Sequence, residues 1–307
     1  MGDTLAYADF PHDSTFLALR RERGIRAAHP WRVVSLRLAC AAMAHTAKGR
    51  NDSRHSAGEP DDLRRLGGPI GTQTNGLIDR LSRRDQSRLL GGCDSCILGQ
   101  REVLSLPRTD LLYVHFPRQG FISLSTTVDP AEALEVALIG REGVVGSHVA
   151  LGVRQSPFRT TVGSEGSAWR IRPALLRTRM SESPNLAQLI RRYAHVLAVQ
   201  IATAVACVHF HLIRPRLARL LLMIRDRCHS DTFTVTQAQL GEMLGVRRVG
   251  ISAEAASLQE EGVIRYSRGS VSILDPGALR AIACDCYDAD RRTYLDLLAP
   301  RAVVEGR

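Results

Sequence analysis

Residues 236–275 run TQAQLGEMLGVRRVGISAEAASLQEEGVIRYSRGSVSILD, and this stretch decides the fold of the C-terminal part of the chain. Thr236 is a favourable helix N-cap, and apolar residues at helical spacing predict a short first helix that buries Leu240, Met243 and Leu244. Gly245 ends this helix, because a residue without Cβ adopts the left-handed conformation of a tight turn at little cost. A second helix is predicted from about residue 247 to residue 260, with its buried face at Ile251, Ala255 and Leu258. This arrangement is typical of a helix-turn-helix, whose second helix enters the major groove of DNA.

The predicted second helix begins with two arginines. A guanidinium can bond guanine O6 and N7 together, so we expect Arg248 to contact a base, whereas Arg247 can equally neutralise a phosphate. Ser252, one turn further along, can bond a phosphate or a base edge. We also place Thr236 and Gln237, at the start of the first helix, among the DNA-binding residues. The alternative is that the two arginines are only a solvated helix end.

A β-hairpin is predicted directly after the second helix. Gly262 ends that helix, and residues 263–266 and 270–274 have the composition of two strands around Ser267, Arg268 and Gly269. Arg268 at the tip of such a wing is placed to reach a neighbouring phosphate. The alternative is a hairpin that only closes the small domain.

A long amphipathic helix is predicted upstream, from Pro184 to about His211, with Ser183 as its N-cap. Its apolar residues recur at steps of three and four and form one stripe: Leu186, Ile190, Tyr193, Leu197, Ile201 and Val205. We expect self-association along this stripe, and burial within its own chain is the alternative, because periodicity does not name the partner. A second amphipathic helix is predicted over residues 216–227.

The preceding region has the pattern of a small antiparallel β-roll. Short strand-like runs at residues 111–116, 121–127, 133–139, 160–162 and 167–171 alternate with turn residues, including a turn at Pro117 to Gly120. A helix is predicted over residues 75–90. Residues 1–74 have no sustained period, and we expect a poorly ordered extension without assigned function. The expected domains are therefore 75–183 for the roll, 184–211 for the long helix, 212–290 for the winged helix-turn-helix and 291–307 for a tail.

The composition fits a protein that binds a polyanion. The 307 residues carry a formal net charge of +10, which favours association with phosphate backbones, although an Arg-rich proteome explains the charge equally well. The apolar run from Val33 to Met43 is interrupted by Arg37 and is too short to cross a membrane, and no secretory signal is visible. We therefore expect a cytoplasmic protein without a membrane partner, whose seven cysteines are reduced.

Residues 236–275 resemble the winged helix-turn-helix of the Crp/Fnr family of bacterial regulators, and the resemblance extends more loosely over residues 75–290. It implies an α+β protein with a cyclic-nucleotide-binding-like roll, a long dimerisation helix and a winged domain that binds double-stranded DNA as a homodimer. It also implies contact with RNA polymerase if the protein is an activator. Arg248 matches the guanine-contacting arginine of the family, while Val249 and Ala253 replace charged family residues, which indicates a divergent DNA site. Val249 can contact a thymine methyl group.

The effector residues differ more from the family. Where cAMP-binding members have Gly-Glu and Arg-Ser pairs, this chain has Gly146-Ser147 and Arg159-Thr160, so the carboxylate that holds the ribose is missing. Arg159 and Thr160 still suit an anion. The equal alternative is an ordinary strand pair that binds no nucleotide. We expect that cAMP is not the effector, and we assign no cofactor.

The cysteines suggest a second function, a redox or metal sensor with DNA binding as its output. Cys93 and Cys96 form a CxxC pair, but too few cysteines are well placed for a four-cysteine cluster unless Cys40 or Cys207 contributes.

Near the end of the long helix, Cys207, His209 and His211 also suggest a metal, but only Cys207 and His211 share a face, so at most two ligands are expected to converge within one chain, and a dimer could double them. Cys284 and Cys286 form a Cys-x-Cys pair near the C-terminus, which we interpret as a feature of this branch of proteins and not as a lone zinc site. We therefore assign no metal site. Catalytic motifs are also missing from the sequence, and we do not expect an enzyme.

Overall fold

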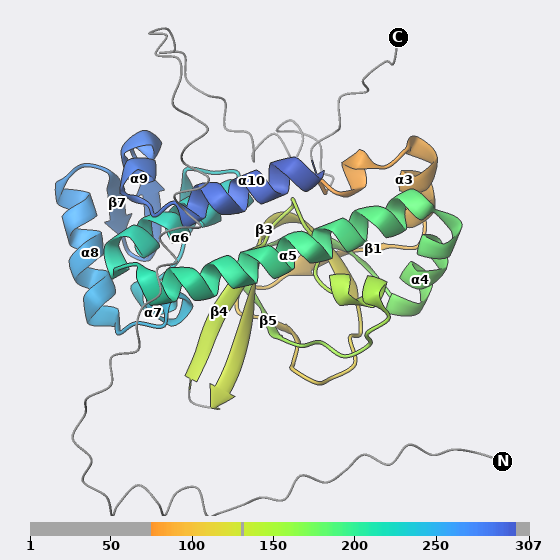
Figure 1. Ribbon diagram of the computed structural model, residues 1–307. Helices are drawn as coiled ribbons and strands as arrows, with labels where there is room; N and C mark the ends of the chain where they lie inside the picture. Colours follow the sequence, from red (N-terminus) through yellow and green to blue (C-terminus); the bar gives the residue numbers. More distant parts are fainter. Residues whose placement is uncertain (1–74, 130–131, 299–307) are drawn as a thin grey trace, which may run out of the picture. The chain divides into compact units, whose positions relative to one another are not determined.

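The computed structural model describes residues 75–129 and 132–298, and the expectations for residues 1–74 and for Cys40 lie outside this part of the chain. The described residues form an α+β fold with two hydrophobic cores, one in an antiparallel roll and one mainly in a C-terminal winged domain. The second core also contains Phe121 and Leu138 of the roll. Figure 1 shows these elements in sequence colours. The expected fold class is confirmed.

The roll is one antiparallel sheet in which β5 is the central strand. The order is β1-β5-β3-β4, and β2 also pairs with β5. Their bounds are β1 Asp94–Leu98, β2 Val103–Ser105, β3 Val114–Asp129, β4 Glu132–Ile139 and β5 Arg159–Ile171. A short 3-10 helix, η3 Ser147–Leu151, lies between β4 and β5.

Three sequence predictions for the roll are wrong in detail. Residues 117–120 are not a turn, because β3 runs through them with register shifts at Pro117 and Gln119. Gly120 has φ of 73°, and a Cβ there would lie 2.6 Å from two carbonyl oxygens of β5, so the irregular pairing requires glycine. The runs at 160–162 and 167–171 belong to the single strand β5. The predicted helix over 75–90 is divided into η2 Ile78–Arg80 and α3 Arg83–Leu90.

The long helix α5, Pro184–Phe210, follows α4, Pro173–Glu182, and packs on the roll. Its N-terminus is capped as expected, since Ser183 accepts a hydrogen bond of 3.2 Å from the Leu186 amide. Most of the predicted stripe is buried in the core of its own chain: Leu186, Ile190, Tyr193 and Leu197. The expectation of self-association along these four residues is therefore wrong.

A second row of α5 residues, spaced by three and four positions, is exposed, and we call it the exposed line. In the C-terminal half of the helix its residues are apolar: Ala198, Ala202 and Val205, of which Val205 is 58% exposed. Among the described residues, α5 is also the one helix long and apolar enough to cross a membrane by length and composition alone, a test that core helices of soluble proteins also pass. Our expectation of no membrane-spanning segment did not consider this helix.

The winged domain is built around a three-stranded sheet of order β6-β8-β7. Its elements are α6 Ile213–Cys228, β6 Thr232–Thr234, α7 Gln237–Leu244, α8 Arg248–Glu260, β7 Ile264–Ser267, β8 Ser270–Ile273 and α9 Pro276–Ile282. The helix-turn-helix and the hairpin are where the sequence predicts them. The strand β6, which pairs antiparallel with β8 of the hairpin, was not predicted.

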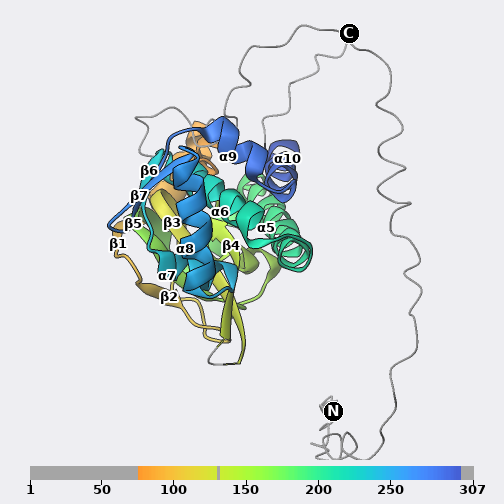
Figure 2. The same cartoon turned by 90° about the vertical axis from the view of Figure 1, so that its left-hand side faces the viewer.

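The chain then returns to the roll through α10, Cys286–Leu298. Figures 1 and 2 both show α10 beside α5. Tyr294 and Leu298 belong to the core of the roll, and Tyr294 lies against the ring of Tyr193. Residues 291–298 are therefore part of a packed helix, where the sequence analysis placed a tail.

One buried arginine of α6 connects the winged domain to the sheet. The Arg227 side chain donates to the Leu138 carbonyl at 3.0 Å and lies 3.2 Å from a Glu142 carboxylate oxygen. Both charged groups are buried, so each requires the other. This pair fixes the end of α6 to the end of β4.

Candidate functional site

The helix-turn-helix is held by local backbone chemistry. Thr236 and Gln239 form a capping box, in which the Thr236 hydroxyl accepts from the Gln239 amide at 3.2 Å and the Gln239 side chain accepts from the Thr236 amide at 2.9 Å. Gly245 ends α7 with φ of 62°. A Cβ on Gly241 would lie 2.9 Å from the Val246 carbonyl oxygen, so the turn also depends on that glycine. The turn fixes the direction in which α8 leaves α7.

The N-terminal end of α8 presents three exposed side chains. Arg247 is the N-cap, Arg248 is the first helical residue, and Val249 is 78% exposed. The opposite face of the helix buries Ile251, Ala255 and Leu258 in the domain core, as predicted. The two arginines and the exposed valine that follows them form a surface that combines positive charge with an apolar contact.

Ser252 is not a free surface hydroxyl. Its Oγ lies 2.6 Å from the Gln237 side-chain oxygen, to which it donates, and this bond joins the start of α7 to the first turn of α8. The Gln237 amide nitrogen remains available as a donor at the same surface. The structure therefore brings Gln237, Ser252 and Arg248 together, which spacing alone does not reveal because fifteen residues separate Gln237 from Ser252.

The wing is a tight two-residue hairpin. Ser267 pairs with Ser270, and the two residues between them have positive φ, 49° at Arg268 and 81° at Gly269. This combination is that of a type I′ turn, which matches the twist of the flanking strands. Arg268 is exposed at the tip.

An arginine that the sequence analysis did not identify fixes the far end of α8. Arg214, near the start of α6, bonds the Ser257 hydroxyl at 2.7 Å and both carboxylate oxygens of Glu261 at 2.6 and 2.7 Å. These bonds hold the pKa of Glu261 below its ordinary value, because the guanidinium favours the charged carboxylate. The periodicity of α6 gave no signal for this contact.

The roll contains a cavity of about 200 Å³ between β5, η3 and α5. Gly146, Ser147 and Thr160 line it, whereas Arg159 is exposed and does not. The remaining wall is mostly apolar, and α5 contributes Ala194, Leu197, Ala198 and Ile201. Lysine, arginine, aspartate and glutamate are all missing from the lining in the described part of the chain.

The polar groups of the cavity are neutral. Ser105 Oγ lies 2.9 Å from Thr160 Oγ1 and 3.2 Å from Ser156 Oγ. His148 also lines the cavity, and burial lowers its pKa, so its imidazole is uncharged at neutral pH. The cavity therefore suits an uncharged occupant better than a phosphate.

The cysteines fall into two groups. Cys93 and Cys96 lie at β1, where burial raises the pKa of Cys93 to about 12 and also raises that of Cys96, so both remain thiols. The second group lies near the end of α5, where donor atoms of Cys207, His211, Cys284 and Cys286 all fall within 4.8 Å of one another. The expectation that at most two ligands converge there is wrong.

Comparison with known proteins agrees with this architecture. Residues 215–282 match the family model for the Crp-like helix-turn-helix domain. A Crp/Fnr-family transcriptional regulator from Eubacterium rectale is 15% identical, with 67% of this chain and 96% of that chain covered and a TM-score of 0.52. FixK2 from Bradyrhizobium japonicum is 11% identical over 62% and 98% of the two chains, with a TM-score of 0.55. The c-di-GMP-responsive global regulator CLP of Xanthomonas campestris is 13% identical over 62% and 99%, with a TM-score of 0.52.

A comparison with curated protein sequences finds no match. At these low identities the structural likeness concerns the fold, and the matched domain supplies the sequence evidence. Together they show a Crp-like helix-turn-helix domain at residues 215–282, joined to a roll in a fold shared with solved structures of Crp/Fnr-type regulators.

Proposed function

We propose that the protein binds double-stranded DNA as a homodimer and regulates transcription in the cytoplasm in response to a signal bound by the roll. The observation that carries this proposal is the exposed surface of Arg247, Arg248 and Val249 at the start of α8. In a helix-turn-helix this end faces the base edges. We propose that the exposed Arg268 of the wing and the Gln237 side-chain amide bond phosphates next to this surface.

The dimer supplies the second half-site contact. The exposed apolar line of α5 at Ala198, Ala202 and Val205 has the spacing of a coiled-coil seam, and its small side chains allow two helices to approach closely. We propose that the two copies of α5 pair there. Two recognition helices would then contact half-sites about one helical turn apart.

The signal is proposed to be a small, uncharged and largely apolar molecule. Among the described residues, the lining of the cavity includes no lysine or arginine for a cyclic phosphate and no carboxylate for a ribose, which supports the expectation that cAMP is not the effector. Its α5 wall includes Leu197, which is buried in the roll, and Ala198, which belongs to the exposed line. An occupant would therefore touch the helix that carries the proposed dimer contact.

We propose no catalytic role for the protein. RNA polymerase is a further partner if the protein activates transcription. The alternative function, a redox sensor, has less support at the CxxC pair, because thiols with a raised pKa react slowly.

The DNA-binding proposal is tested with Arg248→Ala. Loss of one bidentate base contact should weaken specific DNA binding by about 1 to 3 kcal/mol and relax the preference at one base pair. Arg177→Ala is the matched control, since Arg177 is an exposed arginine on α4 and its removal changes the net charge equally.

The binding site is first selected from random duplex DNA with the intact protein, and affinities of both variants are then measured at one fixed salt concentration. An unchanged base preference in Arg248→Ala would overturn the assigned contact. Equal weakening by Arg177→Ala would show that only net charge matters.

A further inference from the structure

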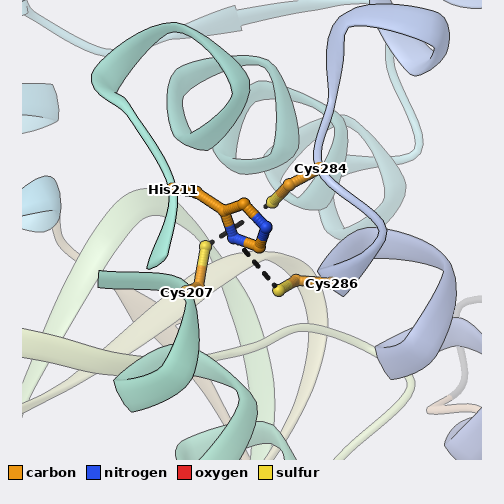
Figure 3. A group of neighbouring side chains, drawn as sticks. All are labelled: Cys207, His211, Cys284 and Cys286. Atoms are coloured by element: carbon orange, nitrogen blue, oxygen red, sulfur yellow. Dashed lines mark hydrogen bonds between the residues drawn. The ribbon is translucent and has the colours of Figure 1, made fainter. Parts of the chain in front are cut away.

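Four potential metal ligands converge where the end of α5 meets the start of α10 (Figure 3). Cys207 lies in the last turn of α5 and His211 is its C-cap. Cys284 precedes α10, and Cys286 is its first residue. The group combines two pairs of side chains from segments more than seventy residues apart in the sequence, so the fold itself assembles it.

The distances within the group fit one tetrahedral ion. Cys207 Sγ and Cys284 Sγ are 3.6 Å apart, and Cys286 Sγ lies 3.6 Å from His211 Nδ1. In a zinc tetrahedron with the usual bond lengths, two sulfurs are about 3.8 Å apart and a sulfur and a nitrogen about 3.6 Å apart. The other pairs lie within 4.8 Å, so all four donor atoms can surround a single central ion with small adjustments.

The donor set selects the metal. Three thiolates and one imidazole form a closed set of the kind found in structural zinc sites. An iron-sulfur cluster distributes its ligands over several irons, and a group confined to 4.8 Å is too compact for that. Oxygen donors, which calcium and magnesium require, are missing from the group.

The surroundings favour an anionic site. Three thiolates and one zinc ion carry a net charge of −1, and the buried Arg219 lies close enough to act on all three cysteines electrostatically. Arg219 is itself paired with Asp290 of α10 at 2.6 Å. The Cys284 amide also lies 3.4 Å from the Pro215 carbonyl oxygen, which holds the loop before α10 against α6.

We propose that Cys207, His211, Cys284 and Cys286 bind one zinc ion, with release of the three thiol protons. The ion would join the end of α5, and thus the junction with the winged domain, to the start of α10. Since the elements from α6 to α9 lie between Cys207 and Cys284 in the sequence, the ion would close a loop of the chain that contains the winged domain. The site would fix the two ends of the winged domain to each other.

The first experiment measures zinc in the intact protein. The full chain is purified without chelators and without a histidine tag, and its metal content is measured by mass spectrometry. We expect about one zinc per chain. The variants Cys207→Ser and Cys284→Ser should lose most of it, and Cys93→Ser and Cys228→Ser, which replace cysteines outside the group, should retain it. The proposal would be overturned if the intact protein bound no zinc after zinc was added, or if it contained iron in place of zinc. It would also be overturned if Cys228→Ser lost as much zinc as the variants of the group.

A second experiment does not depend on the folding of cysteine variants. Apo-protein titrated with Co²⁺ should develop thiolate charge-transfer and tetrahedral ligand-field bands that saturate at one equivalent. His211→Cys should still bind Co²⁺ but with a changed spectrum, because the set becomes four sulfurs. An unchanged spectrum would show that His211 is not a ligand. A disulfide between Cys207 and Cys284 in the purified protein, with no metal bound, would also contradict the site.

Discussion

The residues at the start of α8 show how far local chemistry determines the surface that we propose to contact DNA. The sequence predicts Arg247, Arg248 and Val249 at the start of the second helix, because Thr236 and Gly245 mark the two ends of the first helix through interactions within a few residues. The bond between Gln237 and Ser252 could not be placed, because it depends on how α7 and α8 cross. For the same reason Ser252 has a positioning role that its sequence neighbours do not indicate.

His115 illustrates a residue whose chemistry is decided entirely by burial. It is 6% exposed in β3 and is paired across the sheet with Arg170 of β5, while Tyr113 lies beside its ring. Burial, with a further contribution from the Arg170 charge, lowers the pKa of His115 to about 4. The histidine is therefore neutral in the folded protein at all but acidic pH.

A pH dependence of stability follows from this shift. Between pH 6.5 and 4 the unfolded chain takes up a proton on His115 that the folded protein does not, so the folded state loses stability as the pH falls. The loss from this residue should be about 2 kcal/mol between pH 7 and pH 5. Urea unfolding of His115→Gln should show a smaller loss over that interval, whereas the exposed His195→Gln should behave like the intact protein. An identical pH dependence in His115→Gln would contradict the assignment.

Among the elements, α5 was predicted almost to the residue, but its partner was not. The apolar period fixed the helix and its cap, yet Leu186, Ile190, Tyr193 and Leu197 pack inside the chain. Periodicity identifies a face that is buried and contains no information about what buries it. β6 was missed because three residues are too short for a period, and β3 was divided because Pro117 and Gly120 usually end strands, while here they lie in irregular pairing.

The remaining exposed line of α5 gives a prediction at the scale of elements. Val205→Asp places a charge at the largest exposed apolar side chain of the proposed seam and should convert the dimer to monomer, because two carboxylates would be buried there without partners. Gln188→Asp is a matched control, since Gln188 is exposed on the same line in its polar half. Light scattering after size exclusion measures the mass of each variant. A dimer that persists in Val205→Asp would exclude this seam.

At the scale of the whole molecule, contacts between segments that are distant in the sequence could not be predicted. The predicted roll, long helix and winged domain are all present, whereas the return of α10 to the roll and the meeting of Cys207 with Cys284 depend on contacts across most of the winged domain. Arg159 shows the same limit. Its family position predicted an effector contact, but the side chain is exposed outside the cavity.

The chemistry of the cavity predicts how the whole molecule responds to ligands. The neutral fluorescent probe N-phenylnaphthylamine should bind there with increased fluorescence, and cAMP should neither displace it nor raise Tm. Ala194→Phe should block probe binding, because Ala194 lines the cavity, and Ala174→Phe on the exposed face of α4 should not. Saturable cAMP binding that Arg159→Ala abolishes would refute the proposed class of effector.

The return of α10 to the roll changes the mechanics available to the winged domain. The domain leaves the roll through α5 and comes back to it through α10, where Tyr294 and Leu298 are embedded in the roll's core. Between these two connections, the Arg227–Glu142 pair and the side chains of Phe121 and Leu138 also hold the domain against the sheet. A movement of the winged domain away from the roll would therefore require that α10 leave the core of the roll and that a buried ion pair break at the same time.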